Sequence, residues 1–493
     1  MYRLRFPALP SALPSLALLA LALLACCVPT VARAEPFALS GRVEGLRGRL
    51  VLANRGADTL RLSQDGPFTF ARPVADGQRY EVTVRVHATA QHCTVLGGSG
   101  VATADVADIR VLCEAAGAEL VHELGGGFDG AGWTSAFTED EAGNLYAATA
   151  AGGLDDQGAL IRISPRGEES LVGWFSGQPD SFALPLEPGP GGRLYGVSFR
   201  AGEHQAGMIY RVREQGDFDV LHSFGAAPDA GMLPSSGLLH ASDGHLYGVT
   251  AAGGRGGGGT VYRIDSQGRH TVLHAFVHPL AEASADVLST TASEDGEPQS
   301  APLHAPFGRL LELRPGVLFG TASRGGAAGR GGVFALDLQG RQLYALASMP
   351  ADVAGPMHGL MLASDGRLYG VSSGPGQPGA LWRYDPVQGL AVVHRFADDE
   401  EAARGPRGLL VEGRDARLYG IASRGGPQNA GAIYSFDPGQ QDFQLLHRFT
   451  PESPGDLLGG TPRDGLLLAR DGRLYGSTSV GGRFGGGAVF RID

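Results

Sequence analysis

Arginine offers the clearest binding chemistry in this sequence. The 493 residues include no lysine, which excludes a Schiff base, a serine–lysine pair and the lysine of a phosphate-binding loop. Arginines instead recur in Gly-rich turns, where a ring of guanidinium groups could hold carboxylates or phosphates through paired hydrogen bonds. The candidate ligand-binding residues are Arg200, Arg255, Arg324, Arg424 and Arg483, with Arg330 as a further turn arginine. The competing interpretation is that these arginines pair with acids such as the DDEE run at 398–401.

Two other motifs have the letters of catalytic or phosphate sites but lack their context. GVSSG at 370–374 fits G-x-S-x-G, yet sister segments read GVTAA, GTASR and GIASR, and no helix pattern follows Ser372. GGRGGGGT at 253–260 is as Gly-rich as a phosphate loop but lacks its lysine and helix, so a hairpin is favoured. The sequence therefore predicts no catalytic residue and no cofactor.

Five histidines occupy one slot of a recurring run of the type VLHSF. They are His122, His222, His274, His394 and His447. Because this run should be the outermost strand of its repeat, the imidazoles are expected to lie too far apart to share an ion. Pairing with polar groups of the next repeat is the preferred interpretation, and no metal site is predicted.

These candidate residues belong to repeats of about fifty residues, which must position them. The aromatic residue of an LYG-like motif recurs at intervals of 49 to 56 residues, with one interval of 72. An apolar run precedes each motif, and a Gly-rich turn, a strand such as GTVYRID and the outermost run follow. Four short strands per repeat predict a β-propeller blade. Asp365-Gly366 and Asp471-Gly472 are expected to supply the positive φ angles of two-residue hairpins. The seven aromatic positions are Tyr146, Tyr195, Tyr247, Phe319, Tyr369, Tyr419 and Tyr475.

The two ends of the repeat region complement each other. The last repeat stops after its third strand, at RID (491–493), whereas a spare fourth-strand run, ELVHEL at 119–124, precedes the first repeat. Pairing of the two would complete the last blade and remove an exposed sheet edge. The expected fold of 117–493 is therefore an all-β, seven-bladed propeller of four-stranded blades, closed by an N-terminal strand. An acidic loop between blades, 277–306, accounts for the long interval.

Two segments precede the repeats. Residues 1–34 have the pattern of a signal peptide, with Arg3 and Arg5 before an apolar run and ARA at 32–34 as a cleavage site. A lipoprotein signal that uses Cys26 is the alternative. Residues 35–114 alternate as a small β-sandwich, in which Cys93 and Cys113 are expected to form a disulfide.

Charge and hydropathy limit the partners. Removing the three arginines of the signal moves the formal net charge from −11 to about −14, which argues against nucleic acid and anionic membranes. The apolar run of the signal is too short for a confident transmembrane span, and no second run follows. We expect an exported monomer in the periplasm, outside the cell or at its surface.

The combined motifs DG-x-LYG, the Gly-rich turn, G-[AT]-V-[FY]-R-[IL]-D and VLH-x-F resemble the tandem repeats of GloVer-type exported bacterial proteins. Members of this family are called "choice of anchor" because they end in differing attachment signals. The resemblance covers roughly 117–493 and implies an exported repeat protein with no established reaction. Residues 36–114 resemble Ig-like or carboxypeptidase-regulatory-like modules. No anchor follows Asp493 in this sequence, so the expected mode of attachment stays open.

Three functional hypotheses follow. The first is an exported, non-catalytic propeller that binds a glycan or a protein on its turn-rich face. The second is a lyase or glycosidase for an anionic polysaccharide, which needs two suitably spaced carboxylates or an acid or base beside the arginine turns. The third is a structural component of the cell envelope, which needs no well-formed pocket.

Overall fold

The computed structural model describes residues 36–86, 91–115, 117–125, 130–133, 135–153, 156–175, 184–213, 218–278, 301–374, 376–397, 402–450 and 458–492. The expected signal peptide, with Cys26, lies outside the described residues, as do 279–300 and the acidic run 398–401. In the described part the secondary structure is strands and three short 3-10 turns. None of the helices found there has the length and apolarity needed to cross a membrane.

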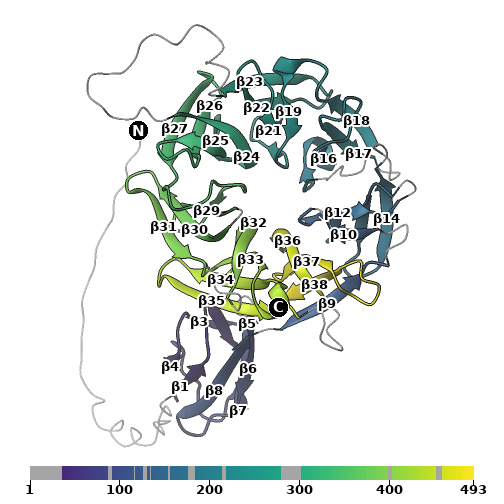
Figure 1. The fold of residues 1–493 in the computed structure, drawn as a ribbon. Helices are drawn as coiled ribbons and strands as arrows, with labels where there is room; N and C mark the ends of the chain where they lie inside the picture. The colour runs from purple at the N-terminus through teal and green to yellow at the C-terminus, as the bar shows by residue number, and fades with distance from the viewer. Residues whose placement is uncertain are drawn as a thin grey trace, which may run out of the picture.

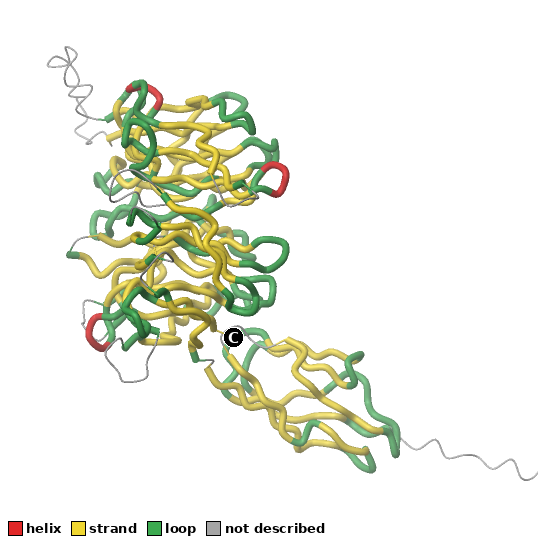
Figure 2. Tube along the Cα trace, turned by 90° about the vertical axis from the view of Figure 1, so that its right-hand side faces the viewer, coloured by secondary structure: helices red, strands yellow, loops and turns green. Residues whose placement is uncertain are grey.

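The first eight strands form an N-terminal module that projects from the rim of a ring (Figures 1 and 2). Its two four-stranded sheets run β4-β1-β8-β6 and β3-β2-β5-β7, and side chains from both sheets share one apolar core. A disulfide joins Cys93 to Cys113, which face each other in the β6–β8 pair. The strands are β1 (Leu39–Glu44), β2 (Leu50–Asn54), β3 (Asp58–Leu62), β4 (Gly66–Thr69), β5 (Arg79–Val86), β6 (Gln91–Leu96), β7 (Ser99–Val101) and β8 (Val106–Ala115).

The later strands form antiparallel sheets arranged radially about one axis, which is the propeller class that the repeats predict (Figure 1). The first half of the ring contains three sheets. They comprise β10 (Ala131–Trp133), β11 (Thr138–Glu139), β12 (Leu145–Ala151), β13 (Ala159–Ile163) and β14 (Glu169–Trp174); β15 (Glu187–Pro188), β16 (Leu194–Ser198), β17 (Met208–Val212) and β18 (Phe218–Ser223); and β19 (Met232–Pro234), β20 (Leu239–His240), β21 (Leu246–Ala252), β22 (Gly257–Ile264) and β23 (His270–Val277). Two 3-10 turns lie in its loops, η1 (Pro190–Gly192) and η2 (Pro228–Ala230).

The second half of the ring repeats this arrangement, with η3 (Pro427–Asn429) in one turn. Its sheets comprise β24 (Ala301–Arg314), β25 (Val317–Gly326), β26 (Gly332–Asp337) and β27 (Gln342–Ser348); β28 (Met361–Leu362), β29 (Leu368–Gly374), β30 (Gln377–Asp385) and β31 (Gly389–Arg395); β32 (Arg404–Glu412), β33 (Leu418–Arg424), β34 (Ala432–Asp437) and β35 (Asp442–Arg448); and β36 (Gly460–Leu468), β37 (Leu474–Val480) and β38 (Ala488–Ile492) with β9 (Ala118–Glu123). A single parallel bridge, Leu409 to Gly465, joins the last two sheets. We name each blade by its strands.

The ring closes as the sequence predicts. Strand β9 pairs antiparallel with β38, so that Val489 faces His122 and Arg491 faces Glu119. The guanidinium of Arg491 also donates to the Glu119 carboxylate at 2.8 and 3.0 Å. Leu124, just after β9, is fully buried. A strand from before the first blade therefore completes the last one.

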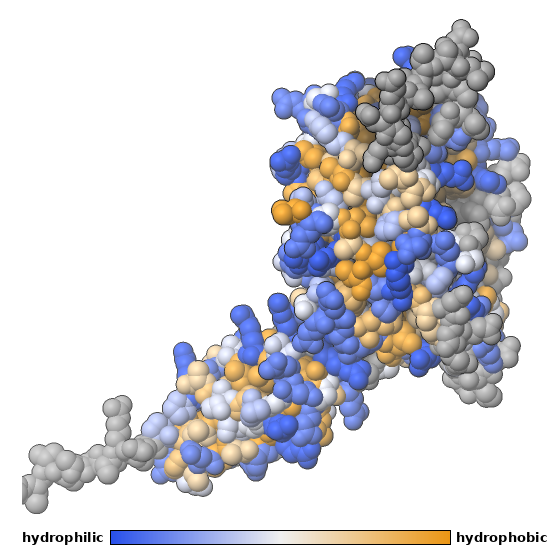
Figure 3. Space-filling model, turned by 60° about the vertical axis from the view of Figure 1, so that its left-hand side comes forward, coloured by the Kyte–Doolittle hydropathy of each residue, from blue (hydrophilic) through white to orange (hydrophobic). Residues whose placement is uncertain are grey.

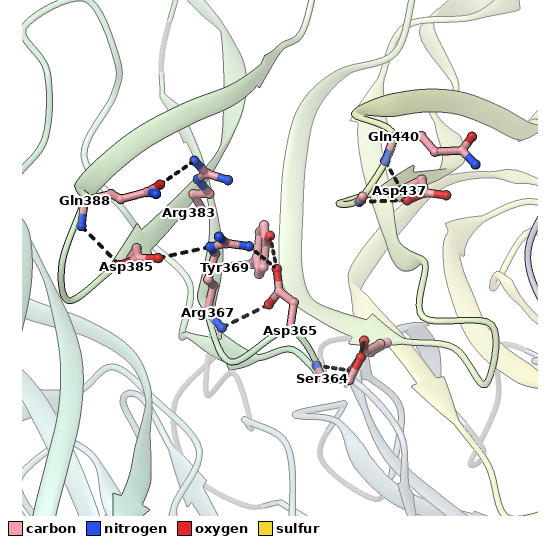
Figure 4. Close-up of polar contacts among 11 residues, drawn as sticks. Ser364, Asp365, Arg367, Tyr369, Arg383, Asp385, Gln388, Asp437 and Gln440 are labelled. Atoms are coloured by element: carbon pink, nitrogen blue, oxygen red, sulfur yellow. Dashed lines mark hydrogen bonds and ion pairs between the residues drawn. The ribbon is translucent and has the colours of Figure 1, made fainter.

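The recurring SDGRLYG stretch is a structural turn. The carboxylate of Asp365 accepts hydrogen bonds from the N–H of Arg367 (2.9 Å) and the hydroxyl of Tyr369 (2.8 Å) (Figure 4). Gly366 alone in this turn has a positive φ, 81°, and its N–H donates to the carbonyl of Ala363. The expected two-residue hairpin with positive φ at the aspartate is therefore wrong. The Asp365 side chain caps a longer turn in which only the glycine is left-handed.

Other blades repeat that turn. In the turn at Asp471 and Gly472, only Gly472 has a positive φ, 90°. The second expected two-residue hairpin is therefore wrong for the same reason. The bond from the tyrosine hydroxyl to the aspartate carboxylate recurs at Asp140–Tyr146, Asp243–Tyr247, Asp415–Tyr419 and Asp471–Tyr475. This turn near Asp415 also meets the N-terminal module, because a Cβ atom added to Gly48 would lie 2.4 Å from Asp415 Oδ2.

Apolar clusters lie between neighbouring blades and hold them together. One cluster joins Ile433 and Phe449 of the β32–β35 blade to Phe490 of β38. Figure 3 shows that apolar residues lie among polar ones on the outer surface seen from one side.

The expected acidic loop 277–306 is wrong at its C-terminal end. Residues 301–306 belong to β24, since His304 pairs with Arg324 and Pro306 with Ala322.

Candidate ligand site in the central channel

The innermost strands of five blades share a bulge that faces the ring axis. In each, the proline and the residue five positions after it pair with two residues of the second strand that are only three positions apart. The innermost strand therefore accommodates two extra residues. In the β36–β38 blade, for example, Pro462 pairs with Thr478 and Leu467 with Tyr475. The bulge segments are 235–238, 307–310, 357–360, 407–410 and 463–466.

These inner bulges line a cavity of about 1450 Å³ in the centre of the ring. Its wall also includes inner-strand residues of the β10–β14 and β15–β18 blades, such as Phe137 and Leu186. At one end it reaches the turns between second and third strands, represented by Gln377 and Arg424. Neighbouring bulges touch through backbone, since a Cβ atom on Gly408 (φ 71°) would lie 2.3 Å from the nitrogen of Gly465. The backbones of these two blades are thus closely packed at the channel wall, and side chains project from them.

Positive charge gathers on the wall between the β32–β35 and β36–β38 blades. Arg404, Arg407 and Arg424 line the cavity, and Arg463 lies next to them on its bulge. Among the described residues, no hydrogen bond or ion pair engages the guanidinium groups of Arg407, Arg424 or Arg463. The buried Nε atoms of Arg404 and Arg463 likewise have no hydrogen-bond acceptor. Donors in this state are suited to an anion.

Asp464 is the acidic residue within this cluster. It has a left-handed φ of 59° and sits at the bulge position that His358 and Gly408 occupy in the two preceding blades. Burial raises the pKa of Asp464 to about 6, although the charges of Arg407 and Arg463 oppose that rise. Burial, and then the charge of Arg407, lower the pKa of His358 to about 3, so this imidazole is neutral at physiological pH.

Arg407 connects these groups electrostatically. Burial lowers its pKa, and the charges of Arg463 and Arg424 lower it further, while Asp464 opposes them. Because an arginine stays protonated even after such a shift, the lowered pKa reports mainly burial of the guanidinium group, with repulsion from Arg463 and Arg424 as a smaller contribution. An anion placed here would relieve that repulsion.

On the opposite wall, Arg309 and Ser235 are engaged in hydrogen bonds between blades. Arg309 donates from Nε to the carbonyl of Leu238 (2.9 Å) and from Nη2 to Glu187 (2.6 Å), across neighbouring blades. The hydroxyl of Ser235 donates to the carbonyl of Pro306 (2.8 Å). These groups connect blades and leave little charge for a ligand.

Apolar side chains complete the wall beside the arginines. Met357 and Leu362, at the two ends of the inner segment of the β28–β31 blade, are 41% and 45% exposed within the channel lining. Met361, Leu409 and Val411 are partly accessible in the same lining. The site therefore combines a cationic end with an apolar surface.

The five arginines predicted from the sequence lie at the surface, in or beside the turns after the second strands. All five are exposed. Only Arg424 lines the cavity; the other four, Arg200, Arg255, Arg324 and Arg483, do not belong to its lining. The further turn arginine Arg330 is also exposed and outside the lining. Their role in ligand binding stays a prediction.

The structure also shows the surroundings of the serine and histidine candidates that the sequence suggested. Ser372 is fully buried in β29, so the G-x-S-x-G interpretation as an exposed nucleophile is excluded. His122 pairs with Glu169 of the next blade, as expected. His222 and His394 instead stack on the rings of His270 and Phe443 of the next blade, at 4.2 and 3.8 Å between ring centres. The expected polar partner is wrong for these two, because an aromatic side chain fills the interblade position.

The residues that sequence reasoning missed are Arg407, Arg463, Asp464 and His358. A signal was present in the segments PSSGLL, PFGRLL, PMHGLM, PRGLLV and PRDGLL, each of which starts with the proline of an inner strand. The proline and the apolar residues recur, whereas the residues directly after the proline differ between repeats. Of the differing residues, Ser235, Phe307, Met357, Arg407 and Asp464 line the cavity, whereas Arg463 does not belong to its lining.

Comparisons with known proteins agree with the repeat architecture. The family model of the Gloeobacter/Verrucomicrobia repeat matches residues 134–297 and 302–493. A search of curated proteins found no match.

Solved structures with a similar fold have low sequence identity. A streptogramin B lyase is 12% identical over 74% of this chain and 93% of its own, with a TM-score of 0.47. A virginiamycin B lyase from Staphylococcus aureus is 12% identical over 74% and 95%, with a TM-score of 0.46. The extracellular domain of a protein described as a hybrid two component system from B. thetaiotaomicron is 8% identical over 76% and 39%, with a TM-score of 0.49. At these values the likeness carries no inference about activity.

Proposed function

The chain belongs to the Gloeobacter/Verrucomicrobia repeat family, and we propose that it is an exported propeller that binds a ligand in its central channel without catalysing a reaction. The observation that carries this proposal is the cavity of about 1450 Å³, in whose lining the guanidinium groups of Arg407 and Arg424 have no hydrogen-bond or ion-pair partner among the described residues. A concave site with a few convergent polar groups is typical of ligand-binding proteins. Glycans and proteins, approaching from the turn-rich face that Arg424 shares, are the ligand classes expected from the sequence.

Catalysis on a polysaccharide has weaker support. Three carboxylates line the cavity, but Glu187 is paired with Arg309, and Glu139 accepts the N–H of Arg470 (2.9 Å). Asp464 alone stands beside the arginine cluster, whereas glycoside hydrolysis requires a pair of carboxylates flanking the bond. A structural envelope component would not need this cavity, so binding is the better explanation.

The organisation that we propose has three parts. Residues 1–34 direct export, residues 35–114 form a spacing or docking sandwich, and residues 117–493 form a seven-bladed propeller. The Cys93–Cys113 disulfide supports an oxidising compartment. We propose that the mature protein is monomeric and acts in the periplasm, outside the cell or on its surface.

Ligand screening of the mature protein tests the proposed function. A glycan array and a small-molecule panel followed by thermal shift would identify binders, whose affinities are then measured for Met357→Trp and Val220→Trp. Met357 lines the channel, and Val220 is 56% exposed on the outer strand β18, so the second variant is a matched control. We expect Met357→Trp to weaken binding at least tenfold and Val220→Trp to leave it unchanged.

Two results would contradict the proposal. Equal binding by both variants would place the ligand outside the channel. Turnover of a binder by the purified protein would show that the propeller is an enzyme.

A further inference from the structure

We propose that the group entering the channel is an amphipathic anion, with its acidic head on Arg407 and Arg463 and its apolar body along Met357 and Leu362. This inference rests on the proposed function and names the class of ligand. Four features of the described residues support it: unpaired cations, a nearby apolar wall, adjacency of the two, and few partners for hydroxyl groups.

The cationic part has unused capacity for an anion. Arg407 and Arg424 line the cavity and Arg463 lies beside them on its bulge; none of the three has an ion pair among the described residues. Asp464 is the single carboxylate placed among them, and its charge interacts with those of Arg407 and Arg463. A carboxylate or sulfonate can accept two parallel N–H bonds from one guanidinium group, which makes the pair directional.

The apolar part begins next to the cations. The charge of Arg407 acts on His358, which follows Met357 in the chain. Leu409 also packs against the inner segment, since a Cβ atom added to Gly359 would lie 2.8 Å from Leu409 Cδ2. From Met357 to Leu362 the inner segment spans at most roughly 17 Å, at about 3.4 Å per residue. A ten-carbon chain fits within that length. Covering the exposed Met357 and Leu362 side chains removes apolar surface from water, which favours binding of an apolar chain.

A hydroxyl-rich glycan would find fewer partners on this wall. Four lining side chains of the β28–β31 blade cannot hydrogen-bond a sugar, namely Met357, Leu360, Met361 and Leu362, whereas its polar lining residues are His358, Ser373 and Gln377. Ser235 and Arg309 across the channel are already engaged with backbone and with Glu187. Polar groups of a glycan would therefore lose water without replacement.

Binding of matched ten-carbon compounds tests the inference. Calorimetry at pH 7.5, below micelle-forming concentrations, would compare sodium decanoate, decanol, decyltrimethylammonium and a galacturonate oligomer on the mature protein. We expect decanoate to bind at least tenfold more tightly than decanol, and the ammonium compound to bind more weakly than both. The double variant Arg407→Ala/Arg463→Ala should lose at least tenfold in decanoate affinity and keep its affinity for decanol.

Controls separate head-group recognition from damage to the fold. Arg314→Ala removes an exposed arginine at the end of β24, outside the cavity lining, and should bind decanoate like the unmodified chain. Arg407→Gln, which removes the charge alone, replaces the double variant if the latter fails to show a cooperative melting transition.

Each contrary outcome has a defined meaning. Equal affinity for decanoate and decanol, no binding of decanoate, or arginine variants that behave like Arg314→Ala would overturn the amphipathic-anion inference. Preferential binding of the galacturonate oligomer would also overturn it, but would leave channel binding intact. If Met357→Trp has no effect on any binder, the proposed function itself fails.

Discussion

In the β19–β23 and β24–β27 blades the two residues after the inner-strand proline are Ser235-Ser236 and Phe307-Gly308, whereas in the β32–β35 and β36–β38 blades they are Arg407-Gly408 and Arg463-Asp464. The backbone register is the same on both sides of the channel. On the first side, Ser235 bonds a neighbouring blade and Arg309 is paired with Glu187; on the second, the arginines have no such partners. The repeated framework thus supports two different walls.

The difference between the two walls shows at which positions ligand specificity can change in this fold. The Asp–Tyr turn and the inner proline hold the strands, so their replacement would disturb every blade in the same way. The bulge residues project from a backbone that other contacts fix, and each can vary without changing the register. Function is therefore expected at the differing positions and stability at the recurring ones.

Deleting 119–124 should have the largest effect on stability, because it removes a strand of the framework. The last blade would lose its β38 pairing, the Arg491–Glu119 ion pair and the buried side chain of Leu124. Burial of one leucine contributes about 2–3 kcal/mol, and the exposed edge adds to the loss. We expect the melting temperature to fall by about 10 °C or more.

The comparison variant lacks 36–114 and retains the complete ring. Since the N-terminal module has its own core and disulfide, its removal should shift the melting temperature by only a few degrees. Circular dichroism melting of both variants beside the mature protein decides the matter. If the 119–124 deletion melts like the mature protein, strand β9 does not close the ring in solution.

Replacing Asp464 should have the next largest effect, and it acts on the cationic wall. Its pKa of about 6 means that the carboxylate is charged at pH 7.5 and neutral at pH 5. Arg407, Arg463 and Arg424 face the same site, and neutral His358 adds no charge above pH 5. Protonation of Asp464 therefore leaves more positive charge for a bound anion.

We expect affinity for decanesulfonate, which stays ionised, to rise about three- to tenfold between pH 7.5 and pH 5. Asp464→Asn should bind it more tightly at pH 7.5 and lose most of the pH dependence. The folded-state pKa is raised, so the aspartate costs stability above pH 6, and the variant should also melt higher at pH 7.5 than the unmodified chain does. A pH dependence that persists unchanged in Asp464→Asn would assign it to another group.

Much of the framework could be predicted from the sequence, because spacing and strand-pair patterns recur in every repeat. The pairing of 119–124 with the C-terminal strand followed from counting strands, and the Cys93–Cys113 disulfide from elimination of other cysteines. The turn at Asp365 was only partly predicted, since the side-chain cap that replaces a left-handed aspartate depends on contacts with Arg367 and Tyr369.

The site was less predictable for a physical reason. A two-residue bulge changes which side chains face the axis, and its location depends on pairing with the second strand. Arg407 and Asp464 consequently do not follow the simple alternation of a strand. The turn arginines were more visible in the sequence, but Arg424 alone among the five lines the cavity.

The smallest expected effects on stability come from Ser235 and Ser236, two adjacent serines of the opposite wall. Because they are adjacent, the two variants test one hydrogen bond in nearly the same surroundings. The Ser235 hydroxyl donates to the Pro306 carbonyl at 2.8 Å, whereas the buried Ser236 hydroxyl has no partner. Ser235→Ala should cost about 1 kcal/mol and lower the melting temperature by roughly 2 °C. Ser236→Ala removes a buried hydroxyl that gains nothing from folding, so its melting temperature should stay within about 1 °C or rise slightly. Differential scanning calorimetry of the two variants resolves this difference. A larger loss for Ser236→Ala than for Ser235→Ala would mean that the wall is not held together by the Ser235 bond, and that the two sides of the channel differ less than their contacts indicate.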